Sequence, residues 1–306
     1  ETIAYQSIAL ESPMRKGVSK SKRAAIGAPR MVAYTLLSVY HGFSAPCSTK
    51  PGMHPLATLS SFRWPDGARG AVSLSFDDGL RTHVENAIPT LNDYRFRGTF
   101  YIPMVRGGAF DQRIDHWRAA ASQGHEIGNH SMTHPCSANF GFSRRALDYL
   151  TLEDITEEIL DAKRRITEDI PDQKAHSFAY PCGETKVGSG KSHVSYVPVV
   201  AEHYVVGRGI GDFANDPVLC DLACTWSFMP TDPPAERLIG WADMARNMGR
   251  WSIFCFHGVG GEHFHLRMEA FRMLLDHLAA HRDQIWTDTV INVGTWIRDH
   301  RERVCA

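Results

Sequence analysis

The sequence predicts an α/β protein built on a parallel sheet that curves into an irregular β/α barrel of about seven strands. From residue 61 onward, short apolar stretches alternate with longer segments that have helical periodicity. This alternation favours a parallel sheet, because parallel neighbours need a long crossover connection that is usually a helix. Polar residues directly follow several of the apolar stretches. They are therefore expected to gather at the carboxyl edge of the sheet.

Seven short apolar segments are predicted to be strands. They are residues 72–76, 99–102, 126–127, 177–180, 204–206, 253–256 and 290–293. The Gly- and Ser-rich stretch between Tyr180 and Arg208 is expected to form a loop over the carboxyl edge.

Four longer segments are predicted to be helices, at residues 84–94, 151–170, 235–248 and 266–281. The second has the clearest pattern, because Thr151 and Asp154 have the spacing of a capping box at its start. Apolar residues then recur along one face of this helix, at Leu152, Ile155, Ile159, Ala162 and Ile166.

Two strand ends carry the ligand types of a metal site. Asp77 and Asp78 directly follow the first predicted strand. His130 and His134 place two imidazoles four residues apart. One carboxylate with two imidazoles is a common ligand set for a catalytic divalent cation, and the spare carboxylate is then a candidate base. Each motif alone is more often structural, as a turn that ends a strand or as a histidine pair on one face of a turn.

His257 follows a later predicted strand and has no second histidine at ligand spacing on that strand. It is therefore a candidate general acid rather than a metal ligand. Its pKa is expected to stay near or above the ordinary value beside a carboxylate, so activity should fall at high pH. The structural alternative is a strand-end histidine bonded to a backbone carbonyl.

The order of these motifs resembles that of the polysaccharide deacetylases of carbohydrate esterase family 4, the NodB-homology domain. The matching stretches are Ser-Phe-Asp-Asp-Gly, His-Ser-x-x-His, Tyr-Pro-x-Gly and a late Phe-His-Gly. The resemblance covers residues 64–298 approximately. It implies a distorted barrel of about seven parallel strands.

The resemblance also implies a role for each matching residue. Asp77 corresponds to the general base, and His257 to the acid that protonates the leaving group. The implied metal ligands are Asp78, His130 and His134. In the loop that contains Tyr180 and Pro181, the amide N–H of Cys182 is implied to help hold the oxyanion.

Two departures from the family pattern stand out. Ala179 occupies a position where the family commonly has an Arg that orients the base. Arg208 is a candidate replacement, with a surface arginine in a Gly-rich turn as the alternative. The family's Asp- and Trp-containing fourth motif has its nearest match at residues 221–226, which makes Asp221 a candidate support.

These residues predict a metal-dependent hydrolase that removes N- or O-linked acetyl groups from a poly- or oligosaccharide. Zinc is the expected metal, with cobalt, nickel and manganese as alternatives. The first alternative function is a same-fold amidase acting on a small non-carbohydrate amide or cyclic imide. The second is an inactive carbohydrate-binding relic, against which the retention of both a base and an acid argues.

Charge and cysteine content bound the remaining possibilities. With a net charge of −1, the chain lacks the excess of basic residues expected of a nucleic-acid-binding protein. No stretch approaches the roughly 20 apolar residues of a membrane span. The 7 cysteines include no Cys-x-x-Cys pair and are expected to be mostly buried thiols. Cys136 and Cys182 differ in lying within the predicted site loops, where a catalytic thiol is an alternative that the metal ligands would make redundant.

The chain is expected to divide into an N-terminal extension, residues 1–60, and a catalytic domain, residues 61–306. Basic residues followed by the apolar run 31–40 have the outline of a secretory signal. A disordered or upstream-translated extension is the alternative. Localisation therefore stays open between secreted or periplasmic and cytoplasmic.

Overall fold

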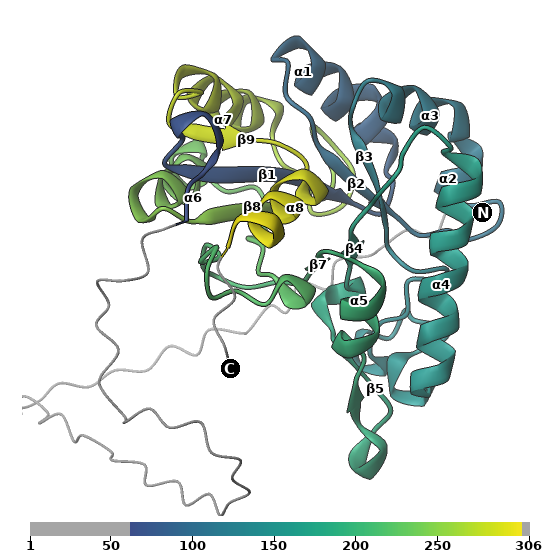
Figure 1. The fold of residues 1–306 in the computed structure, drawn as a ribbon. Helices are drawn as coiled ribbons and strands as arrows, with labels where there is room; N and C mark the ends of the chain where they lie inside the picture. The colour runs from purple at the N-terminus through teal and green to yellow at the C-terminus, as the bar shows by residue number, and fades with distance from the viewer. Residues whose placement is uncertain (1–61, 302–306) are drawn as a thin grey trace, which may run out of the picture. The chain divides into compact units, whose positions relative to one another are not determined.

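The computed structural model describes residues 62–301, so the predicted extension lies outside the described residues. A parallel sheet of seven strands, ordered β7-β4-β3-β2-β1-β8 with β9 also paired to β1, forms a half-barrel (Figure 1). The predicted α/β class and parallel topology are confirmed. The strands are β1 (Gly70–Asp77), β2 (Thr99–Ile102), β3 (Glu126–Asn129), β4 (Phe178–Ala179), β7 (Gly207–Arg208), β8 (Trp251–Phe256) and β9 (Ile285–Thr287).

Strand β1 has neighbours along both edges. β8 pairs with it from Ala71 to Phe76 on one edge. On the other edge, β9 pairs with its first residues and β2 with its last, from Ser75 to Asp77. All eight residues of β1 are consequently buried. This central strand carries the predicted base at its carboxyl end.

The irregular segment 225–228 bridges the open side of the half-barrel between β7 and β8. The amide of Gly209 donates to the carbonyl of Thr225 (2.7 Å), and the amide of Cys255 donates to the carbonyl of Phe228 (2.8 Å). Strands that are far apart in the sheet order are thereby held around one interior, and side chains from β7 and β8 can meet those of β1.

Helices cover the outside of the sheet, with α6 beside β1 and β8, α7 beside α6, and α3 and α4 beside β3 (Figure 1). The exception is α8, which packs against Ala71 and Trp251 on the inner face. The larger ones are α3 (Ile114–Ser122), α4 (Leu152–Asp169), α6 (Ala235–Met248), α7 (Met268–Ala280) and α8 (Val290–His300), and the shorter ones are α1 (Ile88–Asp93), α2 (Ala109–Gln112) and α5 (Val197–His203). The predicted capping box of α4 is present, but Leu152 in its first turn is exposed rather than part of the buried face. Within residues 62–301, no helix is long and apolar enough to cross a membrane.

Alternation along β1 separates a helix-facing core from a polar interior. Val72, Leu74 and Phe76 pack in the cluster that includes residues of α6 and α7. The intervening Ser73 accepts a hydrogen bond from Trp251 Nε1 (3.0 Å), across the face that looks into the half-barrel. Because successive residues of a strand point to opposite faces, Asp77 ends this inward row.

The prediction of a strand at residues 290–293 is wrong, because these residues form the first turn of α8. The Val-Ile-x-Val composition resembles a strand, but the side chain of Thr289 caps the helix by accepting from the Asn292 amide. Val290, Val293 and Ile297 then bury one helical face. The seventh strand is β9, which the sequence analysis missed.

The segment between Tyr180 and Arg208 is also more ordered than predicted. It contains an antiparallel pair, β5 (Lys186–Val187) with β6 (Val194–Ser195), followed by α5. Pro198 suits the first turn of a helix because it has no N–H to leave unpaired there. The strand predicted at 204–206 begins later, at β7, although the carbonyl of Val206 already accepts from Phe178 (2.9 Å).

Candidate active site

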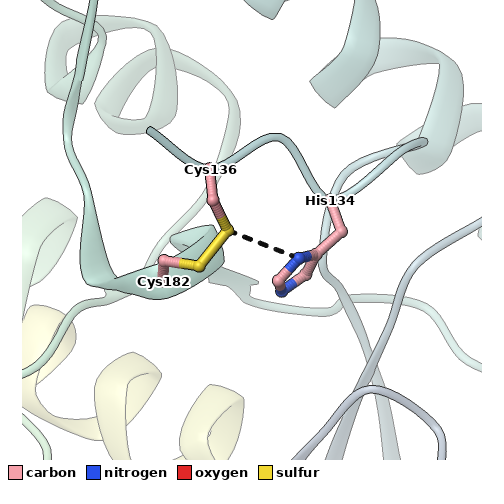
Figure 2. Close-up of side chains that lie close together, drawn as sticks. All are labelled: His134, Cys136 and Cys182. Atoms are coloured by element: carbon pink, nitrogen blue, oxygen red, sulfur yellow. Dashed lines mark hydrogen bonds between the residues drawn. A yellow bond between two sulfur atoms is a disulfide. The ribbon is translucent and has the colours of Figure 1, made fainter. Parts of the chain in front are cut away.

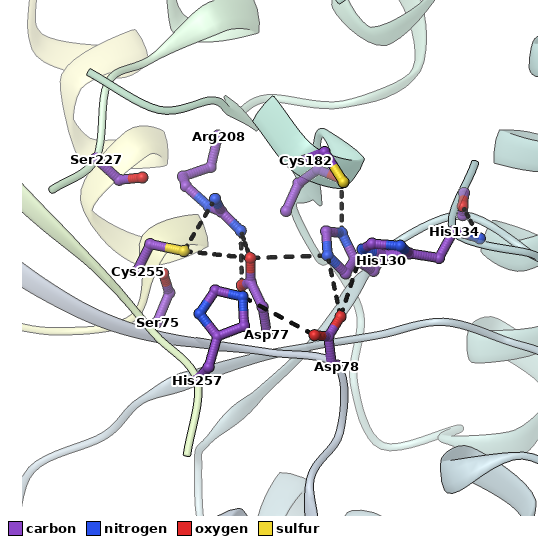
Figure 3. A network of polar contacts seen from close by, with 12 residues as sticks. Ser75, Asp77, Asp78, His130, His134, Cys182, Arg208, Ser227, Cys255 and His257 are labelled. Atoms are coloured by element: carbon purple, nitrogen blue, oxygen red, sulfur yellow. Dashed lines mark hydrogen bonds and ion pairs between the residues drawn. The ribbon is translucent and has the colours of Figure 1, made fainter. Parts of the chain in front are cut away.

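The predicted residues come together at the carboxyl edge of three strands. Asp77 ends β1 and Asp78 follows it, while His130 directly follows β3 and His257 directly follows β8. Figure 3 shows these side chains directed toward one another from separate segments. The fold therefore brings residues as far apart in the sequence as Asp77 and His257 into a single polar cluster.

Asp78, His130 and His134 present donor atoms at a spacing that suits one cation. Oδ1 of Asp78 lies 3.7 Å from Nε2 of His130 and 3.4 Å from Nε2 of His134. The three donor atoms lie within 4.8 Å of one another. Nδ1 of His130 donates to the Ala179 carbonyl (2.9 Å), which leaves Nε2 as the unprotonated nitrogen of a neutral ring.

The protonation states also suit a cation. Burial raises the pKa of Asp78, but a hydrogen bond from His263 and the charges of the nearby histidines together hold it well below its usual range. Burial lowers the pKa of His130 to about 4, against the opposing effect of Asp77. A carboxylate and a neutral imidazole are the forms that bind metal ions. The residues thus fit a divalent cation.

Asp77 has a different set of partners from its neighbour. Its Oδ1 accepts from Nη2 of Arg208 (2.6 Å), and its Oδ2 accepts from the thiol of Cys255 (3.2 Å). Burial raises the pKa of Asp77. The charges of Arg208, His130 and His257 together lower it by more, so the pKa of this carboxyl lies below its ordinary value.

Arg208 is completely buried, so the surface alternative for this residue is wrong. It comes from β7, next to the strand that carries Ala179.

His257 lies beside the cluster without joining the ligand set of His130 and His134. Its Nε2 is 3.9 Å from Oδ2 of Asp78, and its Nδ1 is buried without a partner among residues 62–301. Burial lowers the pKa of His257 more than Asp77 and Asp78 raise it. The expectation of a pKa near or above the ordinary value is therefore wrong, because the residue is only 9% exposed.

His263 is a site residue that the sequence analysis missed. Its Nε2 lies 3.1 Å from Oδ2 of Asp78. The preceding residue, Glu262, accepts hydrogen bonds from the amide (2.8 Å) and hydroxyl (2.6 Å) of Thr82, which anchors this loop to the β1 side. The signal available in the sequence was the histidine-rich stretch 257–265 directly after the strand.

Cys136 and Cys182 form a disulfide, which corrects the prediction of thiols at these positions. The bond joins the loop after β3 to the loop after β4. Nδ1 of His134 lies 3.6 Å from Sγ of Cys136 (Figure 2). Sequence alone gave no basis for this pairing. Cys220, Cys224 and Cys255 are free thiols within the described residues.

The remaining candidates contribute mainly to packing. The Tyr180 ring is buried, and its hydroxyl donates to the Ala223 carbonyl (2.5 Å). Pro181, which follows it, is buried as well. Asp221 accepts from the Ala223 amide (2.9 Å) and caps the turn at Leu222–Cys224.

The sequence matches known families over part of its length. The polysaccharide deacetylase family model matches residues 65–193. A chitooligosaccharide deacetylase from Sinorhizobium fredii is 31% identical over 122 residues, which are 39% of this chain and 51% of the relative. One from Rhizobium leguminosarum bv. trifolii is 38% identical over 65 residues, 21% of this chain and 29% of the relative. The chain therefore matches about half or less of the length of these curated relatives.

Two solved structures share the fold, both provisionally named as polysaccharide deacetylases. The protein from Pseudomonas aeruginosa PAO1 has a TM-score of 0.55 at 14% identity and covers 78% of this chain and 95% of its own. The protein from Mycobacterium smegmatis has a TM-score of 0.53 at 15% identity, with coverage of 80% and 97%. The family model over residues 65–193, the two relatives and the motifs at the strand ends thus agree with the predicted resemblance to the polysaccharide deacetylases of carbohydrate esterase family 4.

Proposed function

We propose that this protein is a metal-dependent hydrolase that removes N- or O-linked acetyl groups from an acetylated poly- or oligosaccharide. The observation that carries the proposal is that two adjacent carboxylates have different partners. Asp78 faces His130 and His134, whereas Asp77 faces Arg208. One carboxylate is thus placed as a ligand and the other as a base.

The proposed cation site consists of Asp78, His130 and His134. Zinc is the expected ion, and cobalt, nickel or manganese would suit the same donors. When bound, such an ion polarises the acetyl carbonyl and lowers the pKa of water. The Ala179 carbonyl keeps the His130 ring turned so that Nε2 faces the carboxylates.

Asp77 is proposed to accept the proton of the attacking water. Its Oδ2 lies 3.7 Å from Nε2 of His130, so the base stands directly beside the ligand cluster. Arg208 holds this carboxylate in place and keeps it ionised at neutral pH. These contacts support the interpretation that Arg208 supplies the guanidinium that the family commonly has at the position of Ala179.

Negative charge that develops on the carbonyl oxygen is proposed to be stabilised by the backbone N–H of Cys182. His257 is proposed to donate a proton from Nε2 to the leaving nitrogen or oxygen. Because this step needs protonated His257, activity should fall as pH rises through its pKa. Burial lowers that pKa, so the decline should begin at lower pH than for an exposed histidine.

The test is acetate release from acetylated xylan, chitin oligomers, peptidoglycan fragments and small amides, measured before and after chelation. The matched control is His134→Ala, which removes one proposed ligand. Release from a saccharide that stops with chelator and returns with metal supports the proposal. Turnover of a small amide or cyclic imide alone would instead identify the amidase, and metal-independent sugar binding without turnover would identify a relic.

A further inference from the structure

We propose that the Cys136–Cys182 disulfide positions the metal ligand His134 and the backbone amide of Cys182, so that reducing it reversibly weakens both metal binding and turnover. The inference rests on the proposed function in taking His134 as a ligand. It adds a role for two residues outside the ligand set, and it makes the site sensitive to its redox surroundings.

The disulfide connects the two loops that carry these groups. Cys136 lies two residues after His134, and Cys182 directly follows Pro181. The linked positions are 46 residues apart in sequence, with α4 between them. Figure 2 shows the His134 ring directed toward the bridge. The bond therefore closes one side of the site covalently.

His130 and His134, the two proposed ligand histidines, differ in the partner of Nδ1, the ring nitrogen that is not proposed to bind the metal. Nδ1 of His130 has the Ala179 carbonyl at 2.9 Å, which is the usual kind of partner for a metal-binding imidazole. Nδ1 of His134 instead has Sγ of Cys136 at 3.6 Å. The orientation of His134 thus depends on a sulfur atom that the disulfide keeps in place.

The other half of the bridge constrains the backbone. Cys182 has φ of 54°, and the next residue, Gly183, has φ of 71°. A left-handed conformation is unfavourable for a residue with a side chain and persists when the surroundings impose it. Cleaving the bond frees Cys182 to relax, and the relaxation would move the amide that is proposed to hold the oxyanion.

The bond can be reached from one side. Cys136 is fully buried, whereas Cys182 is partly exposed. A dithiol would attack Sγ of Cys182 and release Cys136 as a thiolate, which takes a proton. The second thiol of the reagent would then close its own disulfide and release Cys182 as a thiol. Two electrons pass from the reagent to the protein, and the reagent leaves oxidised.

Contact between the loops would survive reduction. The amide of Ser137 donates to Oε2 of Glu184 (2.6 Å), close to each cysteine. The thiols would therefore remain near one another, and reoxidation should restore the bond.

The experiment compares the oxidised protein, the protein reduced with dithiothreitol, and the variant Cys136→Ser/Cys182→Ser, all as the full chain. Dithiothreitol is removed by gel filtration without oxygen before each measurement, because it binds metals. Alkylation and mass spectrometry count the thiols. Metal affinity is measured by competition with a chromogenic chelator, and kcat and KM by acetate release. Circular dichroism verifies that each sample is folded.

Reduction should weaken metal binding by about 10- to 100-fold and lower kcat more than KM changes, and reoxidation should reverse both. The double variant should have the metal affinity and kcat of the reduced protein, and reductant should change neither. Full metal affinity and kcat in a folded, verified reduced protein would overturn this inference alone. An oxidised protein that binds no metal would overturn it together with the proposed function, whereas metal binding without acetate release would contradict only the latter.

Discussion

Nη2 of Arg208 lies 2.6 Å from Oδ1 of Asp77, although the two residues are 131 positions apart in sequence. Both side chains are buried, and the Arg208 guanidinium also lies 5.0 Å from the ring of Tyr101. A buried charge is stable only when it is paired and hydrogen-bonded. The pair therefore fixes the position and the ionisation of the proposed base at the same time.

Replacing Arg208 with Met should leave the Asp77 carboxylate buried without its partner. We expect a loss of about 3–5 kcal/mol in the free energy of unfolding, because one half of a buried ion pair remains. The pKa of Asp77 should rise, since Arg208 is the largest influence that lowers it. Activity that needs ionised Asp77 is lost as pH falls through this pKa, so the acid limb of the pH profile should move to higher pH.

Arg208→Lys is the matched control for that experiment, because it keeps the charge without the planar guanidinium. It should shift the acid limb less than Arg208→Met does. Unchanged pH profiles in both folded variants would show that Arg208 does not control the base.

Asp77→Asn should leave metal affinity nearly intact while turnover falls by about 10²–10⁴-fold, because the proposed general base is lost but the proposed ligand Asp78 remains. Metal content by elemental analysis and acetate release in the same samples provide the test. Loss of the metal together with activity would instead make Asp77 a ligand. Asp78→Asn is the comparison, and it should lose metal.

His257→Ala should lower turnover while metal content stays unchanged. The defect should be smaller for an activated aryl ester than for an acetamide, because a good leaving group needs less help from a proton donor. Rates on both substrates, with the melting temperature of the variant, separate the roles. Equal losses on the two substrates with a lowered melting temperature would identify a structural histidine.

Acid should destabilise the metal-free protein through buried neutral histidines. Burial lowers the pKa values of His83, His125 and His176 to about 4 each. Between about pH 6.5 and 4 the unfolded chain binds more protons than the folded one, so stability falls as pH falls, by on the order of 2–3 kcal/mol per histidine over that range.

Urea unfolding of the chelated protein at several pH values measures this slope. His176→Gln should flatten it, and the same change at the exposed His116 should not. A slope that is unchanged in His176→Gln would contradict the assignment.

The sequence alone determined the features that depend on local pattern. The parallel α/β class, the helix capped by Thr151, and the strand that ends at Asp77 were all predictable, because capping, periodicity and strand-end residues act over a few positions. The family motifs made His130, His134 and His257 candidate site residues for the same reason. Each motif carries its spacing within a short stretch.

The tertiary structure alone decided what those residues contact. The pairing of Arg208 with Asp77, the contact of His263 with Asp78, and the Cys136–Cys182 bridge each join separate segments. Their partners are set by strand order and loop packing, which no local pattern encodes. Burial has the same origin: a histidine's pKa falls when surrounding chain excludes water, and only the folded barrel establishes which histidines are enclosed.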